Sequence, residues 1–140
     1  MATSDKTVIT VNATIFAPIE KVWDYWTDPK HIMQWNNASD DWHTPNAEND
    51  LQVGGKFLSR MEAKDGSMGF DFIGVYSIVE PYSHIAYSMQ DGRLVDIYFK
   101  EKNGSTEIKE SFDAENENSI EMQQAGWQSI LNNFKKYVEL

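Results

Sequence analysis

The sequence predicts an α+β fold in which a curved antiparallel sheet wraps around a long C-terminal helix. Three observations predict this class. Short segments alternate apolar and polar residues with the period of two that strands require, and glycine-containing turn signals separate them. Residues 119–138 instead carry apolar side chains at helical spacing. At 140 residues the chain is expected to form one domain over 1–140, with a loose N-terminal tail at 1–7.

A strand followed by two short helices is predicted at the start of the chain. Residues 8–16 alternate as a strand does. The period then changes to that of a helix, with apolar residues at Ile19, Val22, Trp23 and Trp26. Asp28 and Pro29 suit the N-cap and the first position of a second helix. An NTF2-like cone competes at this length, but such chains usually open with a helix.

Residues 36–55 are predicted to form a long connection rather than a regular element. The stretch is polar, contains Pro45 and ends in Gly54 and Gly55, with at most a short strand near residues 50–53. Loops of this length are uncommon in compact domains and often functional.

From residue 56 onward the pattern is a meander of antiparallel strands. The Asp-Gly and Asn-Gly pairs between strands favour tight hairpins in which both central residues take positive φ. Gly74 lies inside a strand and is predicted to mark a bulge or bend. The predicted strands are 56–63, 69–79, 85–90, 93–101 and 105–112.

One long helix is predicted over residues 119–138. Asn118 suits its N-cap, with Glu121 as the partner in a capping box. Acidic residues near its start, and Lys135 and Lys136 near its end, match the helix dipole. The apolar stripe consists of Ile120, Trp127, Ile130, Leu131, Phe134 and Val138.

The composition limits the classes of partner. The 12 basic and 22 acidic residues give a net charge of −10, which disfavours nucleic acid and anionic membranes, because phosphates need basic side chains. No apolar run is long enough to span a bilayer, and the start MATSDKT carries no secretory signal. Without cysteine there is neither a disulfide nor a thiolate site. We therefore expect a soluble, cytoplasmic protein with no nucleic-acid or membrane partner and no cofactor.

Strand parity predicts a set of inward side chains that could line a cavity. Methionine adapts its shape and aromatic rings stack, so the set suits an apolar or planar ligand. The alternative is that the same side chains simply fill the core. The predicted ligand-binding members are Phe57, Ser59, Met61, Phe70, Phe72, Tyr76, Tyr87, Met89 and Phe99 from the strands, and Trp127 from the C-terminal helix.

Glu110 takes an inward position where an apolar residue is expected. A buried carboxyl needs partners, or else its pKa rises and the group becomes neutral. Gln123 and Gln124, one turn before Trp127, are predicted to face it from the helix, and such polar groups would orient a ligand by hydrogen bonding. A shift of register by one residue would instead place Glu110 in solvent.

The polar connection also concentrates side chains that could bind a metal ion or cover a cavity. Its carboxylates and its single histidine, His43, could ligate a divalent cation, but no metal-ligand spacing is present and no metal site is predicted. We expect instead a lid, in which Trp35 and Trp42 pack over one cavity mouth with His43 at its rim.

Several motifs in a fixed order resemble one family. They are APIEKVWDYWTDP, the tryptophan at position 35, VGGKF, FIGVY and AGWQSILNNFKKYVE. Together they resemble the Aha1-type (activator of Hsp90 ATPase) branch of the START-like, or SRPBCC, superfamily, from about residue 7 to residue 139. The resemblance implies the helix-grip fold with an internal cavity. Relatives include a domain of a eukaryotic co-chaperone that stimulates the Hsp90 ATPase, lipid and hormone binders, and polyketide cyclases.

Three functions follow as hypotheses. The first is a non-catalytic module that binds a small apolar or aromatic molecule between sheet and helix. The second is a co-chaperone-like protein of the stress response, which its acidic charge would steer toward a basic partner. The third is a cyclase- or hydrolase-like enzyme with Glu110 and His43 as acid and base, although no paired titratable groups or nucleophile motif supports catalysis. A homodimer, through residues 8–16 or the tryptophan-rich helix pair, is left open.

Overall fold

An antiparallel sheet of seven strands in the order β1-β7-β6-β5-β4-β3-β2 forms the frame of the molecule. The computed structural model describes residues 7–140, so the tail predicted over 1–7 lies outside the described residues except for Thr7. The strands are β1 (Val8–Ile15), β2 (Trp42–Asn49), β3 (Lys56–Ala63), β4 (Gly69–Glu80), β5 (His84–Met89), β6 (Leu94–Lys102) and β7 (Ser105–Asp113). The helices are α1 (Ile19–Thr27), α2 (Pro29–Trp35) and α3 (Ile120–Val138).

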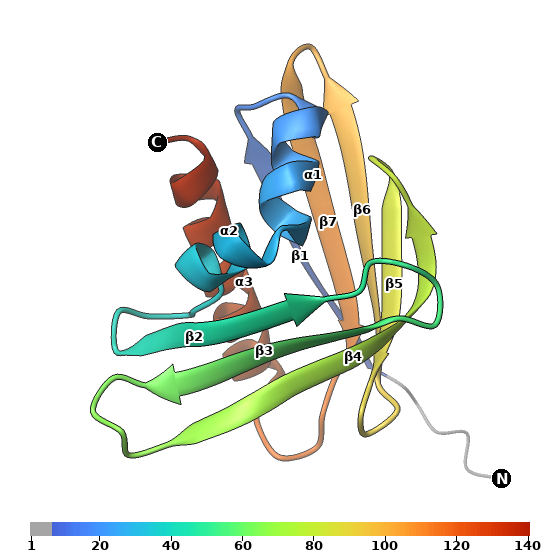
Figure 1. Ribbon diagram of the computed structural model, residues 1–140. Helices are drawn as coiled ribbons and strands as arrows, with labels where there is room; N and C mark the ends of the chain where they lie inside the picture. Colours follow the sequence, from blue (N-terminus) through green and yellow to red (C-terminus); the bar gives the residue numbers. More distant parts are fainter. Residues whose placement is uncertain (1–6) are drawn as a thin grey trace, which may run out of the picture.

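The sheet is strongly bent. In Figure 1, β2, β3 and β4 run across the direction of β1, β7, β6 and β5, and α3 lies along the concave side. The buried apolar side chains form one cluster between the helices and this side of the sheet. The predicted α+β helix-grip fold is therefore confirmed. None of the helices in residues 7–140 is both long and apolar enough to cross a membrane.

The two short helices begin as the sequence predicts. The Asp28 carboxylate caps α2 by accepting a hydrogen bond from the Lys30 backbone N–H at 2.9 Å, and Pro29 takes the first helical position. In α1 the apolar stripe is turned inward, so that Val22 and Trp23 are buried. Local capping and periodicity suffice to define these elements.

β2 replaces most of the connection predicted over 36–55. It occupies Trp42–Asn49, earlier than the short strand expected near residues 50–53, where the chain turns instead. Its sequence lacks clear alternation because β2 is an edge strand, paired only with β3 and largely open to solvent. A register shift between His43 and Asn46, beside a proline, interrupts this free edge.

The turns at the two Asp-Gly pairs differ from the prediction, whereas the turn at the Asn-Gly pair follows it. Asn103 and Gly104 both have positive φ, 55° and 82°, as a two-residue turn requires. In the β3–β4 loop only Gly66 has positive φ, and in the β5–β6 loop only Gly92 does. The β5–β6 loop has three residues between Met89 and Arg93, whose backbone N–H and C=O pair at 2.8 Å, so it follows a different turn geometry.

Gly74 is required for a close contact and does not mark the bulge. The register shift in β4 lies between Tyr76 and Ile78. A Cβ atom at Gly74 would come within 2.3 Å of the Phe57 ring and 2.9 Å of the Tyr87 ring. The glycine therefore lets two aromatic side chains pack directly against the β4 backbone.

The start of α3 corrects the predicted capping box. Ser119 is the N-cap, and its hydroxyl accepts a hydrogen bond from the Met122 backbone N–H at 3.1 Å. Asn118 instead bonds through its side chain to the Glu115 carboxylate, so it is no longer available as the cap. Ile120, the first member of the predicted apolar stripe, is exposed.

Side chains of α3 and of its C-cap, Glu139, cover the free edge of β1. Each forms a hydrogen bond with a β1 backbone group that could otherwise pair with another strand. The bonds recur at every second residue, from Thr10 to Phe16 just beyond the end of β1. A homodimer that paired through residues 8–16 would have to displace these bonds. The pairs are Gln124 with Thr10, Gln128 with Asn12, Lys135 with Thr14, and Glu139 with Phe16.

Candidate functional site

A cavity of about 440 Å³ lies between the bent part of the sheet and the N-terminal half of α3. This volume is in the range of small-molecule sites, roughly 300–1,000 Å³. Most of its wall is apolar and aromatic. The apolar and aromatic lining residues are Trp26, Ile32, Trp35, Phe57, Met61, Phe70, Phe72, Tyr76, Ile85, Tyr87, Ile97, Met122, Trp127 and Ile130.

Ring contacts hold the aromatic wall in place. Trp127 of α3 stacks on Phe112 of β7 with ring centroids 3.9 Å apart and an interplanar angle of 13°. On the opposite side Phe57 meets Tyr87 edge to face at 4.7 Å. Phe72 lies edge-on to both Tyr87 and Trp127, at 6.2 and 6.3 Å. Interlocked rings of this kind form a rigid surface for a flat apolar molecule.

Exposed apolar side chains mark the mouth of the cavity. Phe70, near the start of β4, is 48% exposed, and Met122, in the first turn of α3, is 64% exposed. Both also line the cavity. An apolar molecule could therefore enter between the beginning of β4 and the N-terminus of α3.

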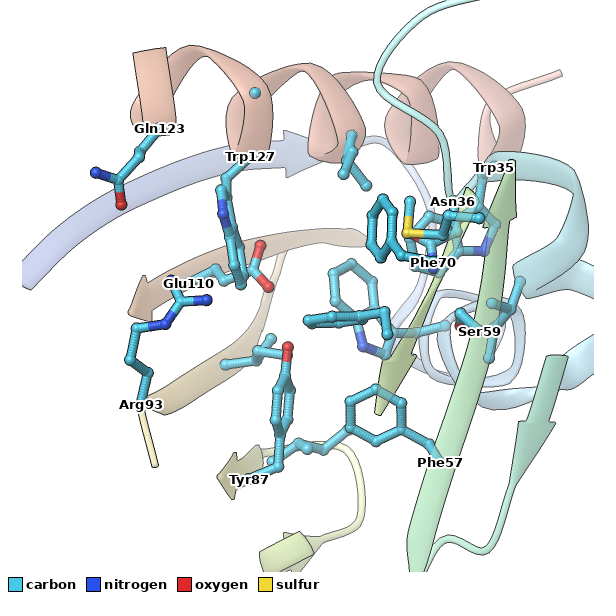
Figure 2. A pocket seen from close by; sticks show the side chains of 18 of the residues that line it. Trp35, Asn36, Phe57, Ser59, Phe70, Tyr87, Arg93, Glu110, Gln123 and Trp127 are labelled. Atoms are coloured by element: carbon cyan, nitrogen blue, oxygen red, sulfur yellow. The ribbon is translucent and has the colours of Figure 1, made fainter. Parts of the chain in front are cut away.

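Glu110 lies inside the molecule, as strand parity predicts. Its neighbours in register are Val11 on β1 and Ile97 on β6, both buried. The side chain is 7% exposed, and Figure 2 shows its carboxyl group directed into the cavity beside Trp127. Burial removes water from the carboxylate and raises the pKa of Glu110 to about 8.

Three buried polar side chains of the cavity wall have no hydrogen-bond partner in the part of the chain that the structure describes. They are Ser59, Tyr87 and Glu110, which are 4%, 6% and 7% exposed. No buried side-chain oxygen or nitrogen among the described residues is both sealed from solvent and unpaired. These three groups therefore open into the cavity, where water or a ligand must complete their hydrogen bonds.

Tyr76 and Gln123, which are also buried on the wall, already have partners. The Tyr76 hydroxyl donates to Asn49 Oδ1 at 2.5 Å. Gln123 accepts from the Glu115 backbone N–H at 2.8 Å and donates to the Asn118 carbonyl at 2.9 Å. Gln123 thus holds the loop before α3, and its amide is not free for a ligand.

Gln124 does not face the cavity. Successive residues on a helix are rotated by about 100°, so two neighbours cannot point the same way. Its side-chain amide donates to the Thr10 carbonyl on β1 at 3.3 Å. The predicted cluster of Glu110, Gln123 and Gln124 is therefore not assembled.

The predicted lid is not present, because Trp42 and His43 belong to β2 and Trp35 ends α2. Trp35 lines the cavity, and its indole N–H donates to the Tyr25 carbonyl at 2.9 Å. Trp42 and His43 are not part of the lining. The His43 ring lies 3.8 Å from the Glu62 carboxylate, on the strand next to β2, and so Glu110 and His43 do not form an acid–base pair.

Met89 and Phe99 belong to the solid core and not to the cavity wall. Phe99 packs edge-on against Trp23 and Trp26. The structure brings together the remaining predicted residues on the wall: Trp35, Phe57, Ser59, Met61, Phe70, Phe72, Tyr76, Tyr87, Glu110, Gln123 and Trp127. That they bind a ligand stays a prediction.

Sequence reasoning missed several lining residues that lie outside the strands. Trp26 was visible as part of an amphipathic helix, but nothing in its spacing showed that α1 reaches the cavity. Arg93 was predicted as the first residue of a strand but lies in the loop before β6, and Glu115 lies in the loop before α3, so periodicity places neither on the wall. Gly126 lines the wall from α3, and nothing lies within 4 Å of the place where a Cβ atom would be. Within residues 7–140 no group of three or more His, Asp or Glu side chains could hold a metal ion.

Comparisons with known proteins agree with the geometry. The model of the family described as activator of Hsp90 ATPase homolog 1-like protein matches residues 16–139. The AHSA1-like protein from Aeromonas hydrophila is 50% identical, with a TM-score of 0.89 over 95% of this chain and 92% of that one. A protein from Cytophaga hutchinsonii is 55% identical, with a TM-score of 0.82 over 94% and 91%. Protein CV1439 from Chromobacterium violaceum shares the fold at 20% identity, with a TM-score of 0.84 over 95% and 97%. No curated protein matches the sequence.

Proposed function

The chain belongs to the family of activator of Hsp90 ATPase homolog 1-like proteins, and from this premise we propose that it binds one small apolar or aromatic molecule between the sheet and α3. The observation that carries the proposal is the cavity of about 440 Å³ with an aromatic wall. Apolar surface that leaves water in such a site contributes about 25 cal/mol per Å². The unpaired polar groups of the wall would orient the guest.

Native mass spectrometry of protein purified from its own host tests this proposal. The wild type should carry an additional small mass that denaturation releases. Gly126→Leu places a side chain in the open space of the cavity and should abolish the additional mass. Ala125→Leu, on the exposed side of the same helical turn, is the matched control and should retain it.

A second measurement makes the test independent of what the host supplies. Ethylnaphthalene, a hydrocarbon without polar atoms, should bind to the wild type and to Ala125→Leu in a saturable way in equilibrium dialysis. Gly126→Leu should bind it at least tenfold more weakly. Absence of both a co-purified mass and saturable uptake would exclude the binding function.

A chaperone-directed role is the second candidate, because the family description names an activator of the Hsp90 ATPase. The test is the ATPase rate of an Hsp90-like chaperone from the same host, with and without this protein. Stimulation that Gly126→Leu leaves intact would assign the activity to the outer surface. Neither nucleic acid nor a membrane is proposed as a partner, since the net charge is −10. A cytoplasmic location stays a prediction of the composition.

A further inference from the structure

Two of the unpaired polar groups face the same part of the cavity from different strands. Tyr87 lies on β5 and Glu110 on β7, the two strands on either side of β6. Tyr87 pairs with Val95 of β6, and Glu110 pairs with Ile97 of β6. β5 and β7 are two strand spacings, about 10 Å, apart, and Tyr87 and Glu110 are diagonal to each other across β6. No hydrogen bond joins the phenol to the carboxyl, so each is open to a ligand group placed between them. Figure 2 shows the Tyr87 hydroxyl and the Glu110 carboxyl pointing toward this space.

Both groups are hydrogen-bond donors at neutral pH. Burial raises the pKa of the Glu110 carboxyl to about 8, so the group holds its proton at pH 7. Burial also raises the pKa of Tyr87 well above its ordinary value, so the phenol keeps its proton over the whole working range. A protonated carboxyl and a phenol that share an apolar site form a pair of donors suited to one oxygen acceptor.

The one cationic side chain of the cavity wall, among the described residues, is paired with a carboxylate outside the wall. Arg93, in the loop before β6, lines the cavity near Glu110, and its guanidinium bonds to Asp91 at 2.7 Å instead of to Glu110. The other ionisable groups of the wall, besides Tyr87, are Glu48 on β2, Tyr76 on β4 and Glu115 before α3, and within the described residues α3 adds no charged side chain to the lining.

We propose that the cavity selects uncharged molecules with an apolar body and a hydrogen-bond-accepting oxygen, such as a carbonyl, and that Glu110 and Tyr87 both donate to that oxygen. The inference rests on the proposed function and names the class of ligand. The hydrogen bond from Glu110 requires the protonated carboxyl. The affinity for such molecules should therefore fall as the pH rises above about 8.

A pair of nearly isosteric probes tests the proposal. Acetylnaphthalene carries a carbonyl, and ethylnaphthalene carries a methylene group in its place. By equilibrium dialysis at pH 7, Glu110→Leu and Tyr87→Phe should each bind acetylnaphthalene about tenfold more weakly, since one buried hydrogen bond is worth about that factor. Both variants should bind ethylnaphthalene at least as tightly as the wild type does.

Glu110→Gln separates recognition from packing. Its amide keeps a donor at the same place and cannot ionise, so it should restore most of the acetylnaphthalene affinity that Glu110→Leu loses. Between pH 7 and pH 9.5 the affinity of the wild type should fall by about tenfold, whereas that of Glu110→Gln should stay constant.

The outcomes distinguish this inference from the proposed function. If neither probe binds to the wild type, the cavity does not bind small molecules and both proposals fail. Both probes could bind to the wild type while Glu110→Leu and Tyr87→Phe lower the affinity for the two probes equally, or for neither. In that case only the proposed donor pair is overturned. Tighter binding of naphthylmethylamine than of acetylnaphthalene, lost in Glu110→Gln, would show instead that Glu110 is an anionic site for amines.

Discussion

The two ends of α3 differ, although one apolar stripe runs along the helix. Toward the C-terminus Leu131, Phe134 and Val138 are completely buried, and we call this the packed end. Toward the N-terminus Gln123 and Trp127 face the cavity, and we call this the cavity end. A helical stripe therefore shows which side of a helix turns inward, but not whether that side meets a filled core or a hollow.

The difference arises from what lies opposite each end. At the packed end α1 and α2 add a further layer, and Phe134 meets the rings of Trp26 and Trp35 edge to face at 4.8 Å each. At the cavity end the helix faces the cavity, whose wall opposite α3 consists mostly of strand residues, with Trp26 of α1 and Trp35 of α2 at its side (Figure 1). Protein interiors normally fill to the density of organic crystals, so a hollow of this size lacks contacts that a filled core would have.

Truncation at the packed end should have the largest effect. Phe134→Ala removes a completely buried ring and should lower the free energy of unfolding by about 3–5 kcal/mol. Trp127→Ala is the comparison at the cavity end and should cost less than half as much, because one side of the indole already faces open space. Urea unfolding measures both. Equal losses would contradict the distinction between the two ends.

Replacement of Glu110 should instead stabilise the cavity end. The folded-state pKa of Glu110, about 8, lies above the ordinary value of 4.5, so the folded protein holds a proton that the unfolded chain releases. Stability from this group is fully present below about pH 4.5 and is lost as the pH rises through about 8. Glu110→Leu removes this loss and should be more stable than the wild type at pH 8.

The pH dependence provides the measurement. The difference in free energy of unfolding between Glu110→Leu and the wild type should grow by about 3 kcal/mol from pH 5 to pH 8, since each pH unit is worth about 1.4 kcal/mol. Taking the difference cancels all groups that titrate alike in both proteins. Asp91 and Glu139, whose pKa values are lowered, act only at more acidic pH. A constant difference would mean that Glu110 is solvated.

Two glycines of the cavity region should respond in opposite directions to the same change. Gly74→Ala brings a methyl group against the Phe57 and Tyr87 rings and should cost about 1–3 kcal/mol. Gly126→Ala meets no atom within 4 Å and should stabilise α3 by about 0.5–1 kcal/mol, because glycine is a poor helix former. Urea unfolding compares the two variants. A large cost of Gly126→Ala would show that the cavity wall is closed at that point.

Most of the fold could be predicted because alternation and turn chemistry are local signals. The same reasoning placed Glu110 inside, since a side chain's face in a strand depends only on parity. β2 could not be predicted, because a solvated edge strand needs no apolar alternation and its pairing with β3 is not local.

Strand parity was less informative about the cavity itself. Met89 and Phe99 share the inward face with Tyr87, yet they are buried in the core without lining the cavity. Which inward residue meets open space depends on the curvature of the sheet and on the position of α1, and both of these are tertiary properties. The direction of the Trp42 and His43 side chains could not be predicted from the sequence either, because β2 contains a bulge that interrupts the alternation.

The side chains that cover β1 should have the smallest effect on stability, and they serve both ends of α3 alike. Gln124→Ala combined with Gln128→Ala removes exposed hydrogen bonds to Thr10 and Asn12 and should cost about 1 kcal/mol or less. It also leaves backbone groups of an edge strand unpaired, so self-association should increase with concentration in sedimentation velocity, whereas the wild type stays monomeric. A wild type that is already dimeric through β1 would contradict this role, because α3 and a second strand cannot occupy the same edge.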